Sequence, residues 1–143
     1  MKDVIDSFRG QYHFLSNFYR EKDGLTVEHR FQAEKNEDPK GRDPFPAKMT
    51  PGQAKAAGRR LHLRGDWETV KNAIMESLIR EKFKDRILAA ELLSTGDSVL
   101  VEGNDWRDKT WGMVKGSDGK WKGENRLGKV LMKIRDELRG MKP

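Results

Sequence analysis

The chain has 143 residues, 29 Lys and Arg against 23 Asp and Glu, and no cysteine. This length favours one domain that buries a core without cross-links, so we expect residues 1–143 to form a single domain. The missing cysteines exclude a disulfide framework and a thiolate metal site. Because no apolar run of membrane-spanning length and no signal-peptide core occurs, we expect a cytoplasmic protein that makes no membrane contact.

The charge balance indicates an anionic partner. The formal net charge is +6 and the sequence pI is about 9.6, and segment 55–86 alone holds nine Lys and Arg against five acids. Acidic residues are interleaved with these cations, so an ordinary solvated surface is the simpler interpretation and attraction to phosphate is the alternative.

The N-terminal half predicts short extended pieces followed by helices. A helical pattern begins at Val27 and places Glu28, Gln32 and Lys35 on a polar face suited to a cleft. Residues 36–50 are predicted to be a loop because they are rich in proline and glycine. Thr50 and Pro51 then form an N-cap and first-turn pair for a short helix that runs to about His62.

The C-terminal half predicts three further helices and one strand. Asp66 starts the clearest helix, whose apolar stripe is expected to consist of Trp67, Val70, Ile74, Leu78 and Phe83, with Lys82 outside it. A second helix carries Ile87, Leu88, Leu92 and Leu93 and ends at Gly96. Residues 98–102 read as a strand, 103–124 as a polar, aromatic loop, and the last helix ends near Gly140. The predicted fold class is therefore mainly α, an α+β arrangement with few short strands.

The common catalytic motifs are absent. The chain contains no Walker loop, no Gly-x-Gly-x-x-Gly after a strand and no Gly-x-Ser-x-Gly. The three histidines, His13, His29 and His62, are too scattered to suggest a zinc site. We therefore expect neither a metal nor a cofactor.

Isolated carboxylates beside aromatic residues remain as candidates. Glu28 and Asp108 are most simply a helix N-terminal acid and a turn former, while Trp67 is most simply a core residue and Asn125 a helix cap. Alternatively, two acids among tryptophans in a basic protein suit a phosphorylated sugar, because carboxylates stabilise a cationic ribosyl transition state and transfer protons.

The order of motifs along the chain resembles the NADAR or YbiA-like N-glycosidase family. Six blocks carry the resemblance: Phe8-Arg9-Gly10-x-Tyr12-x-Phe14-Leu15-Ser16-Asn17-Phe18-Tyr19; Glu28-His29-x-Phe31-Gln32-Ala33-x-Lys35; Ala54-Lys55-x-x-Gly58-Arg59; Arg64-x-Asp66-Trp67-x-x-Val70-Lys71-x-x-Ile74-Met75, with Lys82-Phe83 and Leu100-Val101-Glu102; Asp108-x-x-Trp111-Gly112; and Asn125-x-Leu127-Gly128-x-x-Leu131-Met132-x-Ile134-Arg135. The resemblance implies a YbiA-like single domain that hydrolyses N-glycosidic bonds between a ribosyl phosphate or ADP-ribosyl group and an amino nitrogen.

The same resemblance implies roles for individual residues. Glu28 becomes the principal catalytic carboxylate and Trp67 a substrate-site aromatic. Asp108 becomes the second acid, with nearby Asp105 as the alternative. Further residues are expected to line the site: Arg9, Asn17, Gln32, Lys35, Trp111 and Asn125. The family pattern commonly has tyrosine where this chain has Phe31.

Two substrate classes follow from the resemblance. The net charge favours an ADP-ribosyl adduct on guanine in nucleic acid, because a polyanion gains most from an extended basic surface. A phosphoribosylamino-pyrimidine intermediate of riboflavin synthesis is the alternative. A module that binds ADP-ribose or nucleic acid without catalysis is a third hypothesis, and the oligomeric state is left open.

Overall fold

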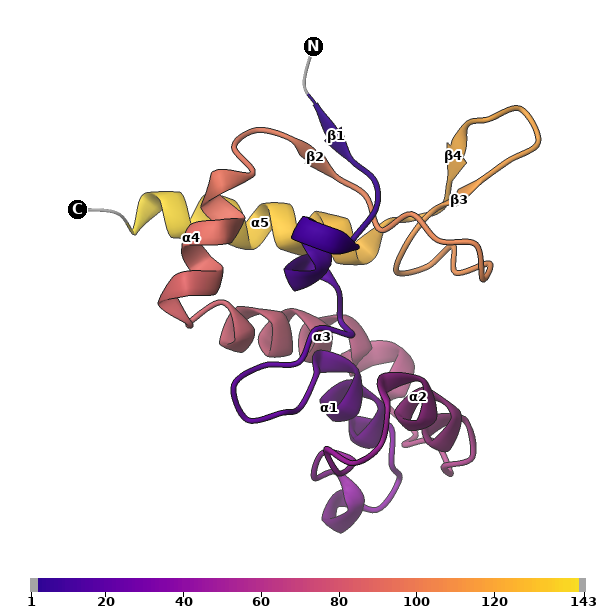
Figure 1. Ribbon diagram of the computed structural model, residues 1–143. Helices are drawn as coiled ribbons and strands as arrows, with labels where there is room; N and C mark the ends of the chain where they lie inside the picture. The colour runs from indigo at the N-terminus through magenta and orange to yellow at the C-terminus, as the bar shows by residue number, and fades with distance from the viewer. Residues whose placement is uncertain (1–2, 142–143) are drawn as a thin grey trace. The chain divides into compact units, whose positions relative to one another are not determined.

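The computed structural model describes residues 3–141 and confirms the mainly α fold class (Figure 1). The prediction of one domain over 1–143 extends beyond the described residues at both ends. The α-helices are α1 (Val27–Glu34), α2 (Pro51–Arg59), α3 (Trp67–Lys82), α4 (Arg86–Ser94) and α5 (Arg126–Gly140), with 3-10 turns at Gly10–Leu15 and Pro39–Gly41. The strands are β1 (Val4–Ile5), β2 (Val99–Leu100), β3 (Val114–Lys115) and β4 (Trp121–Lys122).

The chain divides into two compact units. One unit runs from Asn17 to Lys82 and contains α1, α2 and α3. The other unit combines Met1–Ser16 with Phe83–Pro143 and contains α4, α5 and all four strands.

In the Asn17–Lys82 unit, α1 packs against both α2 and α3. Thr26 caps α1 and Thr50 caps α2, each through a side-chain oxygen that accepts the backbone N–H three residues later. The predicted Thr50–Pro51 start is confirmed, but α2 ends at Arg59, before His62. Residues 36–50 form the predicted loop apart from the 3-10 turn at Pro39–Gly41.

The predicted inner face of α3 is wrong by one helical position. Trp67 is buried as expected, but the other fully buried side chains of this helix are those of Met75 and Ile79, together with the buried Lys82. Three members of the predicted stripe are only half-buried, namely Val70, Ile74 and Leu78, whereas Phe83, directly after the helix, is buried as predicted. Met75 and Ile79 are apolar and have helical spacing, and so do the residues of the predicted stripe. Periodicity alone therefore cannot decide which of the two neighbouring faces of α3 points to the core.

In the other unit, β1 and β2 form a parallel pair in which Val4 lies opposite Val99 (Figure 1). The α5 helix packs against α4 and β2. Gly96 has a φ of +61°, which confirms it as the residue that terminates α4. Ile87, one of the apolar residues of α4, is 65% exposed, because it lies on the outer side of the first turn of this helix.

The segment 103–124 is less irregular than predicted. It contains the short antiparallel hairpin β3–β4, in which Val114 pairs with Lys122. The turn of this hairpin includes Gly119 at a φ of +78°, a left-handed conformation that favours glycine. Strands of two residues are too short for an alternating sequence pattern to reveal.

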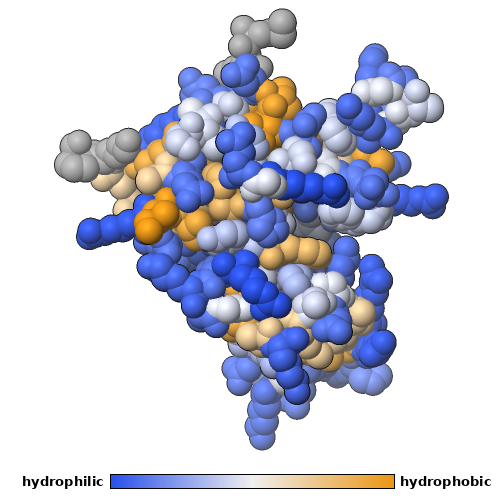
Figure 2. Space-filling model, in the orientation of Figure 1, coloured by the Kyte–Doolittle hydropathy of each residue, from blue (hydrophilic) through white to orange (hydrophobic). Residues whose placement is uncertain are grey.

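The surface agrees with the charge-rich composition. Most side chains on the face shown in Figure 2 are hydrophilic, and the apolar patches on this face are separated by hydrophilic residues. Within residues 3–141, no helix is both long enough and apolar enough to cross a membrane.

Candidate functional site

Glu28 occupies the first turn of α1 with its side chain buried to 7% exposure. Its Oε1 accepts a hydrogen bond of 2.7 Å from Gln32 Nε2, one helical turn later. Its backbone N–H donates to the carbonyl oxygen of Asn17 at 3.1 Å. The N-terminus of a helix stabilises negative charge, so this position suits an ionised carboxylate.

Gln32 owes its position to a glycine on the neighbouring helix. A Cβ atom at Gly58 would lie 2.0 Å from Gln32 Oε1 and 2.9 Å from its Cδ. Gln32 is 4% exposed, and its Oε1 has no hydrogen-bond partner within residues 3–141. The close approach of α2 thus fixes the carboxamide with its Nε2 toward Glu28.

Asn17 presents a second buried acceptor. Its Nδ2 lies 3.5 Å from Met75 Sδ, while its Oδ1 is buried with no hydrogen bond to the described part of the chain. A buried amide oxygen without a partner is costly, and a bound hydroxyl group would satisfy it. This observation fits the predicted role of Asn17 in a sugar site.

Lys35 closes α1 beside two aromatic rings. Its Nζ lies 5.9 Å from the ring centroids of both Phe31 and Trp67. Burial lowers the pKa of Lys35 from its ordinary value, while the charge of Glu28 raises it. The described residues provide no ion-pair partner for this ammonium group, so it is suited to binding an anion.

Three other cations surround Lys35. Arg59, Lys55 and Lys71 each lower the pKa of Lys35 through charge repulsion. Lys71 is paired with Glu68 at 2.6 Å on the outside of α3. We call these four residues (Lys35, Lys55, Arg59, Lys71) the cationic cluster.

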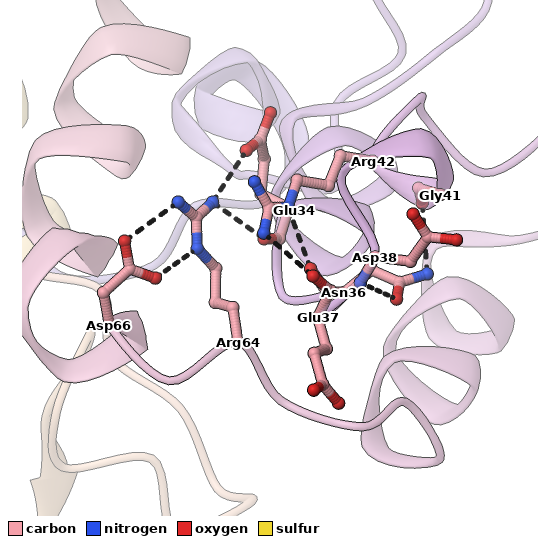
Figure 3. Close-up of polar contacts among 8 residues, drawn as sticks. All are labelled: Glu34, Asn36, Glu37, Asp38, Gly41, Arg42, Arg64 and Asp66. Carbon is pink, nitrogen blue, oxygen red and sulfur yellow. Dashed lines mark hydrogen bonds and ion pairs between the residues drawn. The ribbon is translucent and has the colours of Figure 1, made fainter.

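Trp67 is placed at the start of α3 by an arginine that joins α3 to α1 (Figure 3). The Arg64 guanidinium pairs with both carboxylate oxygens of Asp66, at 2.6 and 3.1 Å, and with Glu34 at 3.6 Å. The backbone N–H of Arg64 also donates to the carbonyl oxygen of Lys35 at 2.9 Å. This pairing holds the pKa of Asp66 below its ordinary value and explains why Asp66 precedes α3 with its side chain turned to Arg64.

The surroundings of Trp67 match the simple core interpretation. Its side chain is 5% exposed, and its ring lies 5.0 Å from that of Phe31 at an angle of 53°. The role of Trp67 toward substrate stays a prediction. With Asn17, Glu28, Gln32 and Lys35, it gives the Asn17–Lys82 unit five of the predicted site residues.

Asp108 belongs to the other unit and forms the turn that its simple interpretation predicts. Its Oδ1 accepts from the backbone N–H groups of Thr110 and Trp111 at 3.0 and 2.9 Å. Asn104 binds both the backbone N–H and the carbonyl oxygen of Asp108. The second oxygen, Oδ2, has no hydrogen bond to the described residues. Asp105 is exposed, so Asp108 is the better ordered of the two candidate acids.

The remaining predicted site residues also lie in this unit. Trp111 is half-buried, with the guanidinium carbon of Arg126 5.9 Å from its ring centroid. Arg9 is exposed. Asn125 precedes α5 as expected but does not cap it, because its φ of +51° turns the side chain toward β2. There its Nδ2 donates to Leu100 O and its Oδ1 accepts from Glu102 N–H.

Comparison with known proteins decides the family. The NADAR domain model matches residues 7–139. The chain belongs to the NADAR family. N-glycosidase YbiA of Escherichia coli is 37% identical over an alignment 150 residues long, gaps included, which covers 96% of this chain and 91% of that protein. An N-glycosidase of Nostoc punctiforme is 40% identical over 122 residues, covering 81% and 75% of the two chains.

The NADAR fold is confirmed by a solved structure. The NMR structure of E. coli YbiA superposes with a TM-score of 0.76 at 37% sequence identity, over 97% of this chain and 87% of that one. The predicted enzyme class, a hydrolase acting on N-glycosyl bonds, is confirmed at the level of the family by the N-glycosidase relatives.

Other NADAR relatives are parts of longer proteins. A riboflavin biosynthesis protein of Vibrio vulnificus is 35% identical over 141 residues, which cover 91% of this chain but 36% of that protein.

Sequence reasoning missed several residues that hold this site together. Arg64, Gly58 and His29 were noted as part of the family pattern, without a structural role for any of them. For His29, the signal in the sequence is its position three residues after Thr26, which is the spacing of the two residues of a capping box. Within residues 3–141, no group of three or more His, Asp or Glu side chains is placed to hold a metal ion.

Proposed function

We propose that this NADAR protein hydrolyses the bond between the anomeric carbon of an ADP-ribosyl group and the amino nitrogen of guanine in nucleic acid. In the reaction, water forms a bond to the anomeric carbon, the carbon–nitrogen bond breaks, and the leaving nitrogen gains a proton. The observation that carries the proposal is the buried Glu28 carboxylate, which is held by Gln32 on the same helix that ends in Lys35.

Glu28 has the properties that such a reaction requires. The transition state carries positive charge on the ribose, and a fixed, buried carboxylate stabilises that charge more strongly than water does. The same carboxylate can accept a proton from the attacking water.

The cationic cluster supports a phosphate-bearing substrate. Lys35 lacks an ion-pair partner within residues 3–141, and Arg59 and Lys55 lie close enough to lower its pKa. A pyrophosphate group would relieve this repulsion and compensate for the burial of Lys35. The unpartnered Oδ1 of Asn17 supports a substrate that also carries hydroxyl groups, as ribose does.

A phosphoribosylamino-pyrimidine is the second candidate substrate. It shares the ribose, the phosphate and the amino nitrogen, and relatives named riboflavin biosynthesis proteins favour it. The net charge of +6 favours the nucleic-acid adduct, because a polyanion interacts with more of a basic surface than a single phosphate does.

One experiment compares the two candidates. Purified protein is incubated with an oligonucleotide that carries ADP-ribosylated guanine and, separately, with a phosphoribosylamino-pyrimidine, and the release of ADP-ribose or ribose phosphate is followed. We expect faster release from the oligonucleotide, with a rate that falls as salt rises. Preferential release of ribose phosphate would support the second candidate, and binding without release of either product would contradict catalysis.

A further inference from the structure

The His29 side chain connects two parts of the Asn17–Lys82 unit, the first turn of α1 and the end of the 36–50 loop. Its side chain is completely buried, and both ring nitrogens form hydrogen bonds. Nδ1 lies 2.7 Å from Thr26 Oγ1 and 3.3 Å from the Thr26 backbone nitrogen, while Nε2 lies 2.8 Å from the carbonyl oxygen of Met49.

The partners fix which nitrogen of His29 carries the proton. A carbonyl oxygen only accepts, so Nε2 must donate to Met49. Nδ1 is then free to accept from the hydroxyl and the backbone N–H of Thr26, while Thr26 Oγ1 accepts from the backbone N–H of His29 at 3.1 Å. One neutral tautomer therefore completes the capping box of α1 and binds the far end of the 36–50 loop.

The end of this loop is held by further bonds. The backbone N–H of Phe45 donates to the carbonyl oxygen of His29 at 3.2 Å. The Arg20 guanidinium donates to the carbonyl oxygens of Ala47 and Met49 at 2.9 and 3.0 Å. Arg20 is exposed and His29 is buried, so the histidine is the inner of the two side chains that hold residues 45–49.

We propose that His29 is a positioning residue with two separable effects on the candidate active site. Through Nδ1 it fixes the first turn of α1, and with it the adjacent Glu28. Through Nε2 it fixes the loop that begins directly after Lys35, and with it the environment of the cationic cluster. The effect on catalysis rests on the proposed function of Glu28, whereas the effect on the loop does not.

Two substitutions divide these effects. In His29→Asn the side-chain oxygen can replace Nδ1 as the acceptor for Thr26, but the side chain is too short to reach Met49. In His29→Leu both contacts are lost, because an apolar side chain offers neither an acceptor to Thr26 nor a donor to Met49. His29→Gln would not serve, since a glutamine at this position can accept from the backbone N–H of the cap residue, as Gln53 does from Thr50 in α2 at 2.8 Å. His62→Asn and His62→Leu, at an exposed histidine of the same unit, are the matched controls.

The readouts are kcat, KM and hydrogen exchange of the Phe45 amide. We expect His29→Leu to lower kcat about 10- to 100-fold relative to His29→Asn, because small displacements of a catalytic group have effects of that size, while KM and Phe45 exchange change alike in the two variants. We expect His29→Asn to raise KM and accelerate Phe45 exchange about 10-fold or more while kcat changes less. The His62 variants should behave like the unmodified protein.

The proposal fails if His29→Leu and His29→Asn have the same kcat, or if Phe45 exchange is unaffected in His29→Asn. Nitrogen NMR of the unmodified protein gives a measurement that does not depend on folding of the variants: a His29 ring protonated at Nδ1 instead of Nε2 would also overturn it. If the unmodified protein hydrolyses neither substrate, the proposed function fails, and Phe45 exchange still tests the attachment of the loop.

Discussion

Lys82 is a buried cation at the end of α3, with 2% of its surface exposed. Its Nζ lies 5.2 Å from the centre of the Tyr19 ring. Burial lowers the pKa of Lys82 to about 7, and the charge of Glu21 opposes this shift. Lys82 was predicted on the outer face of the helix, because a hydrophobicity pattern counts every lysine as a polar residue, whatever its position on the helix.

This burial predicts a pH-dependent stability. The pKa of Lys82 is lower in the folded chain than in the unfolded chain, so the unfolded state binds more protons between pH 7 and about 10.5. The burial penalty is complete below pH 7 and is relieved as pH rises through this range. We expect the free energy of unfolding of the unmodified protein to increase from pH 7 to 10 relative to that of Lys82→Met.

Chemical denaturation at several pH values measures this difference. Lys84→Met, at an exposed lysine two residues away, is the matched control and should remain parallel to the unmodified protein. If Lys82→Met also remained parallel to it, the lysine would be charged in the folded state throughout this range, and the burial argument would be wrong.

At the scale of elements, the contact between α1 and α2 depends on Gly58. Replacing a glycine inside a helix by alanine usually stabilises it by about 0.5–1 kcal/mol. At Gly58 the added Cβ would meet the buried Gln32 carboxamide, so we expect Gly58→Ala to destabilise the fold by about 1–3 kcal/mol. Displacement of Gln32 from Glu28 should also lower kcat.

Gly52 in the same helix provides the control. The nearest atom to a Cβ added there is Thr50 Oγ1 at 3.8 Å, an ordinary contact. Thermal unfolding should therefore show Gly52→Ala as stable as the unmodified protein or more so. A Gly58→Ala protein with unchanged melting temperature and unchanged kcat would show that Gln32 can move without consequence.

The helix boundaries were predictable because they depend on local chemistry. Thr50 with Pro51 and the left-handed Gly96 act within one turn of chain, and the structure has them as expected. The orientation of α3 and the exposure of Ile87 depend on what packs against each helix, which periodicity does not contain. Asn125 shows the same limit, since its side chain binds a strand more than 20 residues away.

For the candidate site, the predictable part was the polar face of α1. Glu28 and Gln32 are spaced to meet one turn apart, and they do. The role of Gly58 needed the packing of a second helix, and that of Arg64 needed the approach of α1 to α3. The residues proposed to act directly are thus visible in the sequence, while those that position them emerge from the fold.

At the scale of the whole molecule, the chain joins a basic surface to a NADAR fold. The match to the family extends over residues 7–139 and therefore includes both units. The net charge of +6 is a property of the complete chain. Such a charge attracts a polyanion over a long range, before any specific contact forms. The proposed chemistry, in contrast, depends on one carboxylate in the Asn17–Lys82 unit, that of Glu28.

The most direct test of this account is the release of ADP-ribose from ADP-ribosylated guanine DNA by the unmodified protein and by Glu28→Gln. The glutamine can still accept from Gln32 Nε2, so the fold should be retained while kcat falls about 100- to 10,000-fold. Glu37→Gln, at an exposed acid shortly after α1, should retain most of the activity. A folded Glu28→Gln protein that releases ADP-ribose at the rate of the unmodified protein would contradict the central claim.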